Sequence, residues 1–140
     1  MTASIDLHLP YRPEDYQGIS SDFHDHSRRR PPSRSPGIDY PLRAGREILA
    51  AAAGTVRRVS RDADAGLYII LDHPGGWLTL YCHLSSIHVA GGDRVALGDL
   101  IGRAGTTGRS TGPHLHFALK RDGRWIDPAP YLTANERSSP

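Results

Sequence analysis

The sequence predicts an all-β fold in which antiparallel strands surround a groove. Glycine and proline are frequent, with Gly 15 and Pro 11 among 140 residues, and this favours short strands and tight turns over long helices. Apolar residues alternate with the others along 114–119, which is the period-two pattern of a half-buried strand. A β-hairpin is indicated where a Pro-Gly-Gly turn at 74–76 separates two strand-like segments, 67–71 and 77–83.

The elements expected before this hairpin are less regular. Residues 1–20 are polar, contain Pro10 and Pro13, and indicate an extended arm, and residues 21–36 indicate a long irregular loop without a core of its own. The regular part begins at 37–40. Residues 47–56 then predict two short strands separated near Gly54, although four consecutive alanines also favour a helix there.

After the hairpin we expect a short strand at 94–97, another at 100–105, a polar loop over 106–112, and then the alternating strand. A turn at Asp122-Gly123 leads back to Trp125 and Ile126. The length fits one domain, which we place at residues 1–133 with the arm and loop at about 1–36. Residues 134–140 indicate a flexible tail.

Composition excludes several classes of protein. A net charge of +2 does not indicate nucleic-acid binding, and a single cysteine, Cys82, excludes an intramolecular disulfide. We expect Cys82 to be a small core residue. The chain has no apolar stretch of transmembrane length and no apolar signal-peptide region at its N-terminus, so we expect no membrane span.

Three histidines stand on predicted strands. His114 and His116 project from one face of the alternating strand, because residues two apart in a strand share a face. His83 ends the second hairpin strand, on a polar face that it shares with Tyr81 and Thr79, and we expect Leu78 and Leu80 on the opposite, apolar face. Surface histidines are the simpler interpretation of each alone, but together they are suited to one metal ion or one substrate. We interpret His73 as a turn residue.

A set of short motifs in unbroken order makes the chain similar to a known family. The motifs are Gly37-Ile38-Asp39-Tyr40, Ala53-Gly54-Thr55-Val56, Tyr81-Cys82-His83-Leu84-Ser85, Gly92-Asp93-Arg94-Val95, Gly105-Thr106-Thr107-Gly108, Thr111-Gly112-Pro113-His114-Leu115-His116-Phe117 and Asp127-Pro128. Over about residues 20–132 the chain resembles the lysostaphin-type zinc metallopeptidases, which cleave peptide bonds in peptidoglycan.

The resemblance implies a role for each matching residue. Asp39 and His116 stand at positions that bind zinc in that family, and His83 and His114 at positions that face the attacking water and the scissile carbonyl. It also implies a substrate, the peptide stems or cross-bridges of peptidoglycan, and a site of action at the cell wall, on its extracellular or periplasmic side. We expect a monomer. A phage lysis enzyme and an excised domain of a longer secreted protein would both fit.

One position departs from the family pattern. The family has a zinc-binding histidine four residues before the aspartate, and Ser35 stands there. Serine is a poor zinc ligand, so a metal-free, inactive scaffold or activator domain is the alternative function. His24 and His26 lie upstream, joined to Asp39 by a proline-rich loop that can bend back. We predict that His26, the nearer of the two, is the third zinc ligand, with His24 as the alternative.

Overall fold

The computed structural model describes residues 4–28 and 34–132, and within them the regular structure is mainly antiparallel β-sheet. The predicted all-β class is therefore confirmed. The predicted tail at 134–140 lies outside the described residues. The strands are β1 (Ile38–Pro41), β2 (Glu47–Leu49), β3 (Gly54–Asp62), β4 (Gly66–His73), β5 (Trp77–Ile87), β6 (Arg94–Val95), β7 (Leu100–Ala104), β8 (His114–Arg121) and β9 (Arg124–Ile126).

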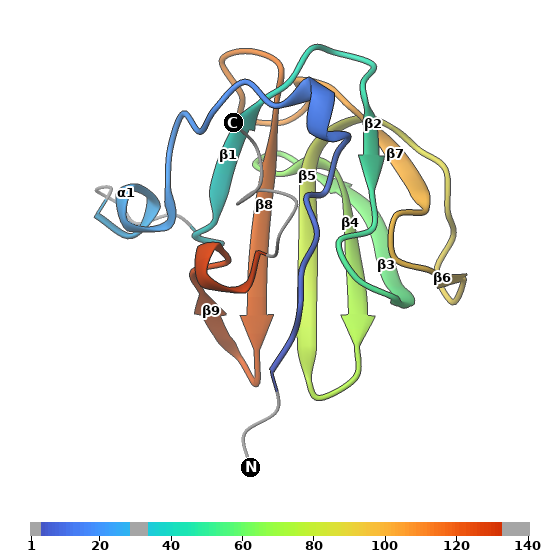
Figure 1. Ribbon diagram of the computed structural model, residues 1–140. Helices are drawn as coiled ribbons and strands as arrows, with labels where there is room; N and C mark the ends of the chain where they lie inside the picture. The colour runs from blue at the N-terminus through green and yellow to red at the C-terminus, as the bar shows by residue number, and fades with distance from the viewer. Residues whose placement is uncertain (1–3, 29–33, 133–140) are drawn as a thin grey trace.

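The strands form one sheet with the order β1-β8-β5-β4-β3-β6 (Figure 1). The long strand β5 pairs with β8 through its first half and with β7 through its second half, and β7 also pairs with β2. The strand β9 pairs with the end of β8. The centre of the sheet is thus the pair β5–β8, which carries three of the predicted site histidines.

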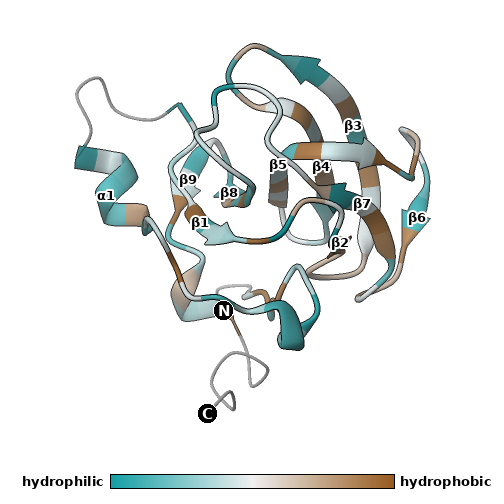
Figure 2. Cartoon of the chain, turned by 90° about the horizontal axis from the view of Figure 1, so that it is seen from above, coloured by the Kyte–Doolittle hydropathy of each residue, from teal (hydrophilic) through white to brown (hydrophobic). Residues whose placement is uncertain are grey.

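The interior of the sheet holds the core. Leu115, Phe117 and Leu119 of β8 are fully buried, which confirms the apolar face predicted from their alternation. Figure 2 shows hydrophobic residues along β4, whereas α1 is largely hydrophilic. Cys82 is also buried, as expected for a small core residue.

The faces of β5 are opposite to those predicted. Thr79 and Tyr81 are completely buried, whereas Leu78 and Leu80 are half-buried. The polar atoms of this buried face are satisfied within it, because the hydroxyls of Thr79 and Tyr81 are 2.9 Å apart and Tyr81 also accepts the backbone N–H of Ala51. The positions of the apolar residues therefore did not predict correctly which face of β5 is buried.

His73 is not a turn residue, contrary to prediction. It ends β4, is 4% exposed, and continues the same buried network. Its Nδ1 donates to the carbonyl of Ala53 at 2.7 Å, and its Nε2 lies 2.8 Å from the Thr79 hydroxyl. Its imidazole is held among buried polar groups.

The N-terminal segment packs against the sheet. Leu7, Leu9 and Tyr11 are buried in the core, and the segment runs in front of the sheet in Figure 1. Isolated bridges tie it to distant parts of the chain, with Leu7 beside Leu132, Tyr11 beside Ile48 and Ser21 beside Asp39. The arm is thus part of the folded core.

The predicted irregular loop at 21–36 contains a short helix, α1 (Phe23–Arg28), which corrects that prediction. Asp22 and Asp25 cap its start reciprocally, each carboxylate accepting the backbone N–H of the other residue. Two single-turn 3₁₀ helices complete the described elements, Pro13–Asp15 and Ala129–Tyr131. Within residues 4–28 and 34–132, no helix has the length and apolarity needed to cross a bilayer.

Candidate metal centre

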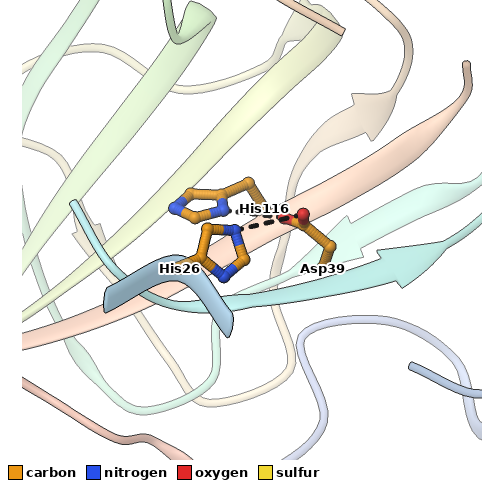
Figure 3. Close-up of side chains that lie close together, drawn as sticks. All are labelled: His26, Asp39 and His116. Carbon is orange, nitrogen blue, oxygen red and sulfur yellow. Dashed lines mark hydrogen bonds and ion pairs between the residues drawn. The ribbon is translucent and has the colours of Figure 1, made fainter. Parts of the chain in front are cut away.

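Three elements bring His26, Asp39 and His116 together at one edge of the sheet. One potential ligand atom from each residue lies within 4.8 Å of those of the other two. Asp39 of β1 is directly opposite His116 of β8 in the strand register, and α1 delivers His26 from outside β1 (Figure 3). All three side chains are buried, with residue exposures of 1%, 8% and 6% respectively.

The backbone of the N-terminal segment places α1. Asp39 forms two backbone hydrogen bonds with this segment: its N–H donates to the carbonyl of Ser21 at 2.8 Å, and its carbonyl accepts the N–H of Ser20 at 3.0 Å. This short antiparallel contact extends the sheet beyond β1. The chain then turns into α1, and His26 points back to the carboxylate, with Nε2 3.1 Å from Asp39 Oδ2.

Hydrogen bonds on the far side of each imidazole identify the nitrogen that can bind a metal. His26 Nδ1 lies 2.7 Å from the carbonyl oxygen of Asp22, and His116 Nε2 lies 2.6 Å from that of Ser35. A carbonyl only accepts, so these nitrogens carry protons. His26 Nε2 and His116 Nδ1 both face Asp39. Each can donate an N–H to the carboxylate or, once that proton is lost, offer a lone pair to a metal.

This donor set fits zinc. A catalytic zinc ion takes about three protein nitrogen or oxygen ligands and keeps one position open. Carbonyl acceptors on the remote ring nitrogens are the usual outer partners of metal-binding histidines. Two imidazole nitrogens and a carboxylate that converge in a buried site therefore have the chemistry and the orientation that the metal requires.

Ser35 has a role that its residue type did not suggest. Its main-chain carbonyl, rather than its side chain, is the close partner of His116, with the hydroxyl farther away at 3.5 Å. Ser35 thus orients a candidate ligand from the position where the family has a ligand. No sequence signal reveals this, because any residue can supply a carbonyl.

His24 and His26 are distinguished by burial. His26 is 1% exposed, whereas His24 lies on the exposed side of α1. The structure thus brings the preferred candidate to Asp39, and His24 is outside the group of three.

His83 and His114 lie beside the three candidate ligands. Their ring centroids are 4.6 Å apart, and the His83 ring is 6.2 Å from that of His116. The same hydrogen-bond pattern recurs in both: His83 Nδ1 lies 2.7 Å from the Thr107 carbonyl, and His114 Nδ1 lies 2.9 Å from the Gly112 carbonyl. His114 Nε2 is left 3.7 Å from Asp39 Oδ1, on the side of the candidate ligands.

Burial and charge set the protonation of the site. Burial opposes the ionisation of Asp39, but hydrogen bonds from His116 and His26 outweigh it and hold the pKa of the carboxyl well below its usual range. Burial lowers the pKa of His83, and the neighbouring His114 and His116 add to that shift against the opposing effect of the Thr107 carbonyl. The site therefore combines an ionised carboxylate with an imidazole that favours its neutral form.

A hollow of about 300 Å³ opens beside Asp39 and His114. Its walls come from the N-terminal segment and from the loop before β8, with these lining residues: Ser20, Ser21, Asp39, Pro41, Thr111, Gly112, Pro113 and His114. The polar loop predicted at 106–112 thus forms one wall. The hollow is thus lined by one candidate metal ligand, Asp39, and by His114.

Curated relatives share the sequence over most of this chain. An "Uncharacterized metalloprotease" of Haemophilus influenzae is 38% identical over 114 residues, which cover 79% of this chain and 24% of the relative. The "Peptidoglycan DD-endopeptidase ShyA" of Vibrio cholerae is 37% identical over 114 residues, covering 78% of this chain and 26% of the relative. The chain thus spans about a quarter of the length of these relatives.

Solved structures share the fold. A zinc-containing peptidase from Vibrio cholerae superimposes with a TM-score of 0.77 at 31% identity, covering 89% of this chain and 39% of that one. The catalytic domain of lysostaphin from Staphylococcus simulans gives a TM-score of 0.66 at 33% identity, covering 68% of this chain and 76% of that one. The sequence signature described as Peptidase family M23 matches residues 33–128. The predicted lysostaphin-type resemblance is confirmed, and the chain belongs to peptidase family M23.

Proposed function

We propose that this protein is a zinc-dependent metalloendopeptidase that hydrolyses peptide bonds in bacterial peptidoglycan. The observation that carries the proposal is the orientation of His26, Asp39 and His116, whose potential ligand atoms converge while backbone carbonyls hold the remote ring nitrogens. The family match supports peptidase chemistry. The relative named as a peptidoglycan DD-endopeptidase supports the substrate, and with it action on the wall side of the membrane.

His26, Asp39 and His116 would hold the metal. When bound, zinc supplies a Lewis acid that polarises the peptide carbonyl and lowers the pKa of water to about 7. Asp39 stays ionised in this site, so it contributes one negative charge against the two positive charges of the ion. His26 joins the centre in place of the family histidine, and Ser35 orients His116 from the position that this histidine would occupy.

His83 and His114 would move the protons. Each commits Nδ1–H to a carbonyl, so Nε2 of the neutral ring is the free base. A neutral imidazole beside the scissile bond can take the proton of the attacking water and later donate it to the leaving amine. The other imidazole, when protonated, can donate a hydrogen bond to the developing oxyanion.

The test combines metal content with hydrolysis. Purified protein should contain about one zinc per chain, release peptides from purified peptidoglycan, lose this activity with a chelator and regain it with added zinc. Protein that is folded yet binds no zinc and cleaves no peptidoglycan would contradict the proposal and favour the inactive scaffold. Sedimentation of the same sample would test the expected monomer.

A further inference from the structure

His83 occupies an unusual backbone conformation. Its φ is +65°, in the left-handed region that residues other than glycine rarely adopt. Two residues of β5, Cys82 and His83, stand between positions that enclose a single residue of β4, because Leu67 pairs with Leu84 and Ile69 pairs with Tyr81. This extra residue is a β-bulge, a feature that turns a side chain out of the regular alternation. His83 therefore depends on its surroundings to keep its orientation.

Thr107 forms hydrogen bonds both to His83 and to the two strands beside it. Its carbonyl accepts the His83 Nδ1–H at 2.7 Å. Its hydroxyl donates to the carbonyl of Leu84 at 2.7 Å and accepts the backbone N–H of Leu67 at 3.0 Å. One side chain thus joins β4 and β5 at the Leu67–Leu84 pair, directly beside the bulge, while its own main chain holds the imidazole.

Gly66 allows this contact. It has a φ of +65°, and a Cβ atom at this position would collide with the Thr107 hydroxyl and main chain. The turn before β4 also holds His83 directly, because the His83 N–H donates to the carbonyl of Ala65 at 2.7 Å. The loop before β8 and the β3–β4 turn therefore meet at Thr107, next to His83.

We propose that Thr107 is a positioning residue for His83: its hydroxyl fixes the loop at the bulge so that its carbonyl holds the imidazole with Nε2 toward the reacting centre. The catalytic part of this inference rests on the proposed function. Thr107 itself is neither one of the three candidate metal ligands nor one of the residues that line the hollow beside them. Its effect should therefore fall on turnover rather than on metal or substrate binding.

Three variants test the proposal. Thr107→Val keeps the shape of the side chain but removes the hydroxyl, so the backbone groups of Leu67 and Leu84 lose their shared partner. Thr107→Ser restores the hydroxyl. Thr79→Val is the matched control, because Thr79 is also a buried, hydrogen-bonded threonine but belongs to the His73 and Tyr81 network within the core.

With zinc-loaded protein and a soluble peptidoglycan-derived peptide, Thr107→Val should lower kcat by about 10- to 100-fold. This is less than the loss of about 10²- to 10⁴-fold for removing a positioned acid–base group, because the imidazole of His83 is kept but less well oriented. We expect KM and zinc content to stay close to those of the wild type. Thr107→Ser should recover most of kcat, and Thr79→Val should lower thermal stability while folded protein keeps its kcat. Nitrogen NMR of His83 should show the Nδ1–H tautomer in the wild type and a mixture in Thr107→Val.

An unchanged kcat and an unchanged His83 spectrum in folded Thr107→Val would overturn the positioning role. Equal losses of kcat in Thr107→Val and Thr79→Val, relative to their stabilities, would overturn it too, since general destabilisation would then suffice. If the wild type cleaves nothing, the proposed function fails, yet the NMR comparison still decides whether Thr107 orients His83.

Discussion

Every histidine of the candidate site donates one ring N–H to a backbone carbonyl. The carbonyls belong to Asp22, Thr107, Gly112 and Ser35 for His26, His83, His114 and His116 respectively. Because a neutral imidazole has one donor and one acceptor nitrogen, the backbone determines which nitrogen faces the centre. The sequence supplies the four histidines, and the main-chain carbonyls determine which ring nitrogen of each one faces the site.

His26 and His24 allow a comparison within one helix. Replacing His26 by alanine should weaken zinc binding strongly, because the centre keeps only Asp39 and His116 from the described protein ligands. Replacing the exposed His24 by alanine should leave zinc at about one per chain. Metal analysis after dialysis against a weak chelator measures both, and full zinc retention in His26→Ala would contradict the assignment.

We expect His83 and His114 to be needed for catalysis but not for metal binding. Replacing either by alanine should lower the hydrolysis rate by about 10²- to 10⁴-fold, the range for a positioned acid–base group. Zinc should remain bound, since neither residue belongs to the group of three. Rates and zinc content measured on the same preparation check this, and loss of metal in both variants would move these residues into the ligand set.

At the scale of elements, the helix α1 has few buried contacts with the rest of the protein. It is six residues long, and His26 is its only buried residue. A helix this short is not stable by itself, and it buries no large apolar side chain completely. Its position therefore depends on the Ser21–Asp39 backbone contact before it, on the capping of its first turn and on the interactions of His26.

We expect zinc to hold α1 in place. Removing the metal should accelerate amide hydrogen exchange over residues 25–28 while β8 amides stay protected, because β8 lies in the middle of the sheet. The variant His26→Ala should show fast exchange in α1 even with zinc present. Protection of α1 that is the same with and without zinc would show that other contacts hold the helix.

The elements differ in how well sequence predicts them. The strand β8 could be predicted because its apolar residues alternate strictly and face one core. The strand β5 was also predicted as a strand at 77–83. Its buried face could not be predicted, because that face carries Thr79 and Tyr81, whose hydroxyls find partners only in the folded protein. The position of α1 could not be predicted either, since the Ser21–Asp39 contact that places it joins segments far apart in the sequence.

At the scale of the whole molecule, a second group of buried, hydrogen-bonded polar side chains lies inside the sheet and does not belong to the candidate metal centre. His73, Thr79 and Tyr81 form it inside the sheet, and burial raises the pKa of Tyr81 to about 12. Burial also lowers the pKa of His73, although the Ala53 carbonyl and Asp72 favour its charged form. Folding therefore favours neutral His73.

This shift predicts a pH dependence of stability. Unfolded His73 binds a proton near pH 6.5, whereas the folded residue binds it only at lower pH, so the free energy of unfolding should fall as pH drops below about 6.5. One group contributes at most about 1.4 kcal/mol per pH unit. Chemical denaturation of the wild type and His73→Gln between pH 7.5 and 5.5 should show a shallower decline in the variant.

Contributions from the metal ligands and from the other histidines are shared by both proteins and cancel in this comparison. Equal slopes would show that His73 does not carry the effect. The sequence did not predict this network, because His73 stands immediately before Pro74-Gly75-Gly76 and its neighbours along the chain indicate a turn.

The docked N-terminal segment bears on how this peptidase-family domain can be transplanted into fusion proteins. The family signature covers residues 33–128, but Leu7, Leu9 and Tyr11 are buried and Leu7 pairs with Leu132. A graft cut at the signature would expose the core surface that these side chains cover, at about 1.5–3 kcal/mol for each, and would leave His26 behind. A working cassette should therefore begin before Leu7 and end after Leu132, and its fusion partner should be attached outside both.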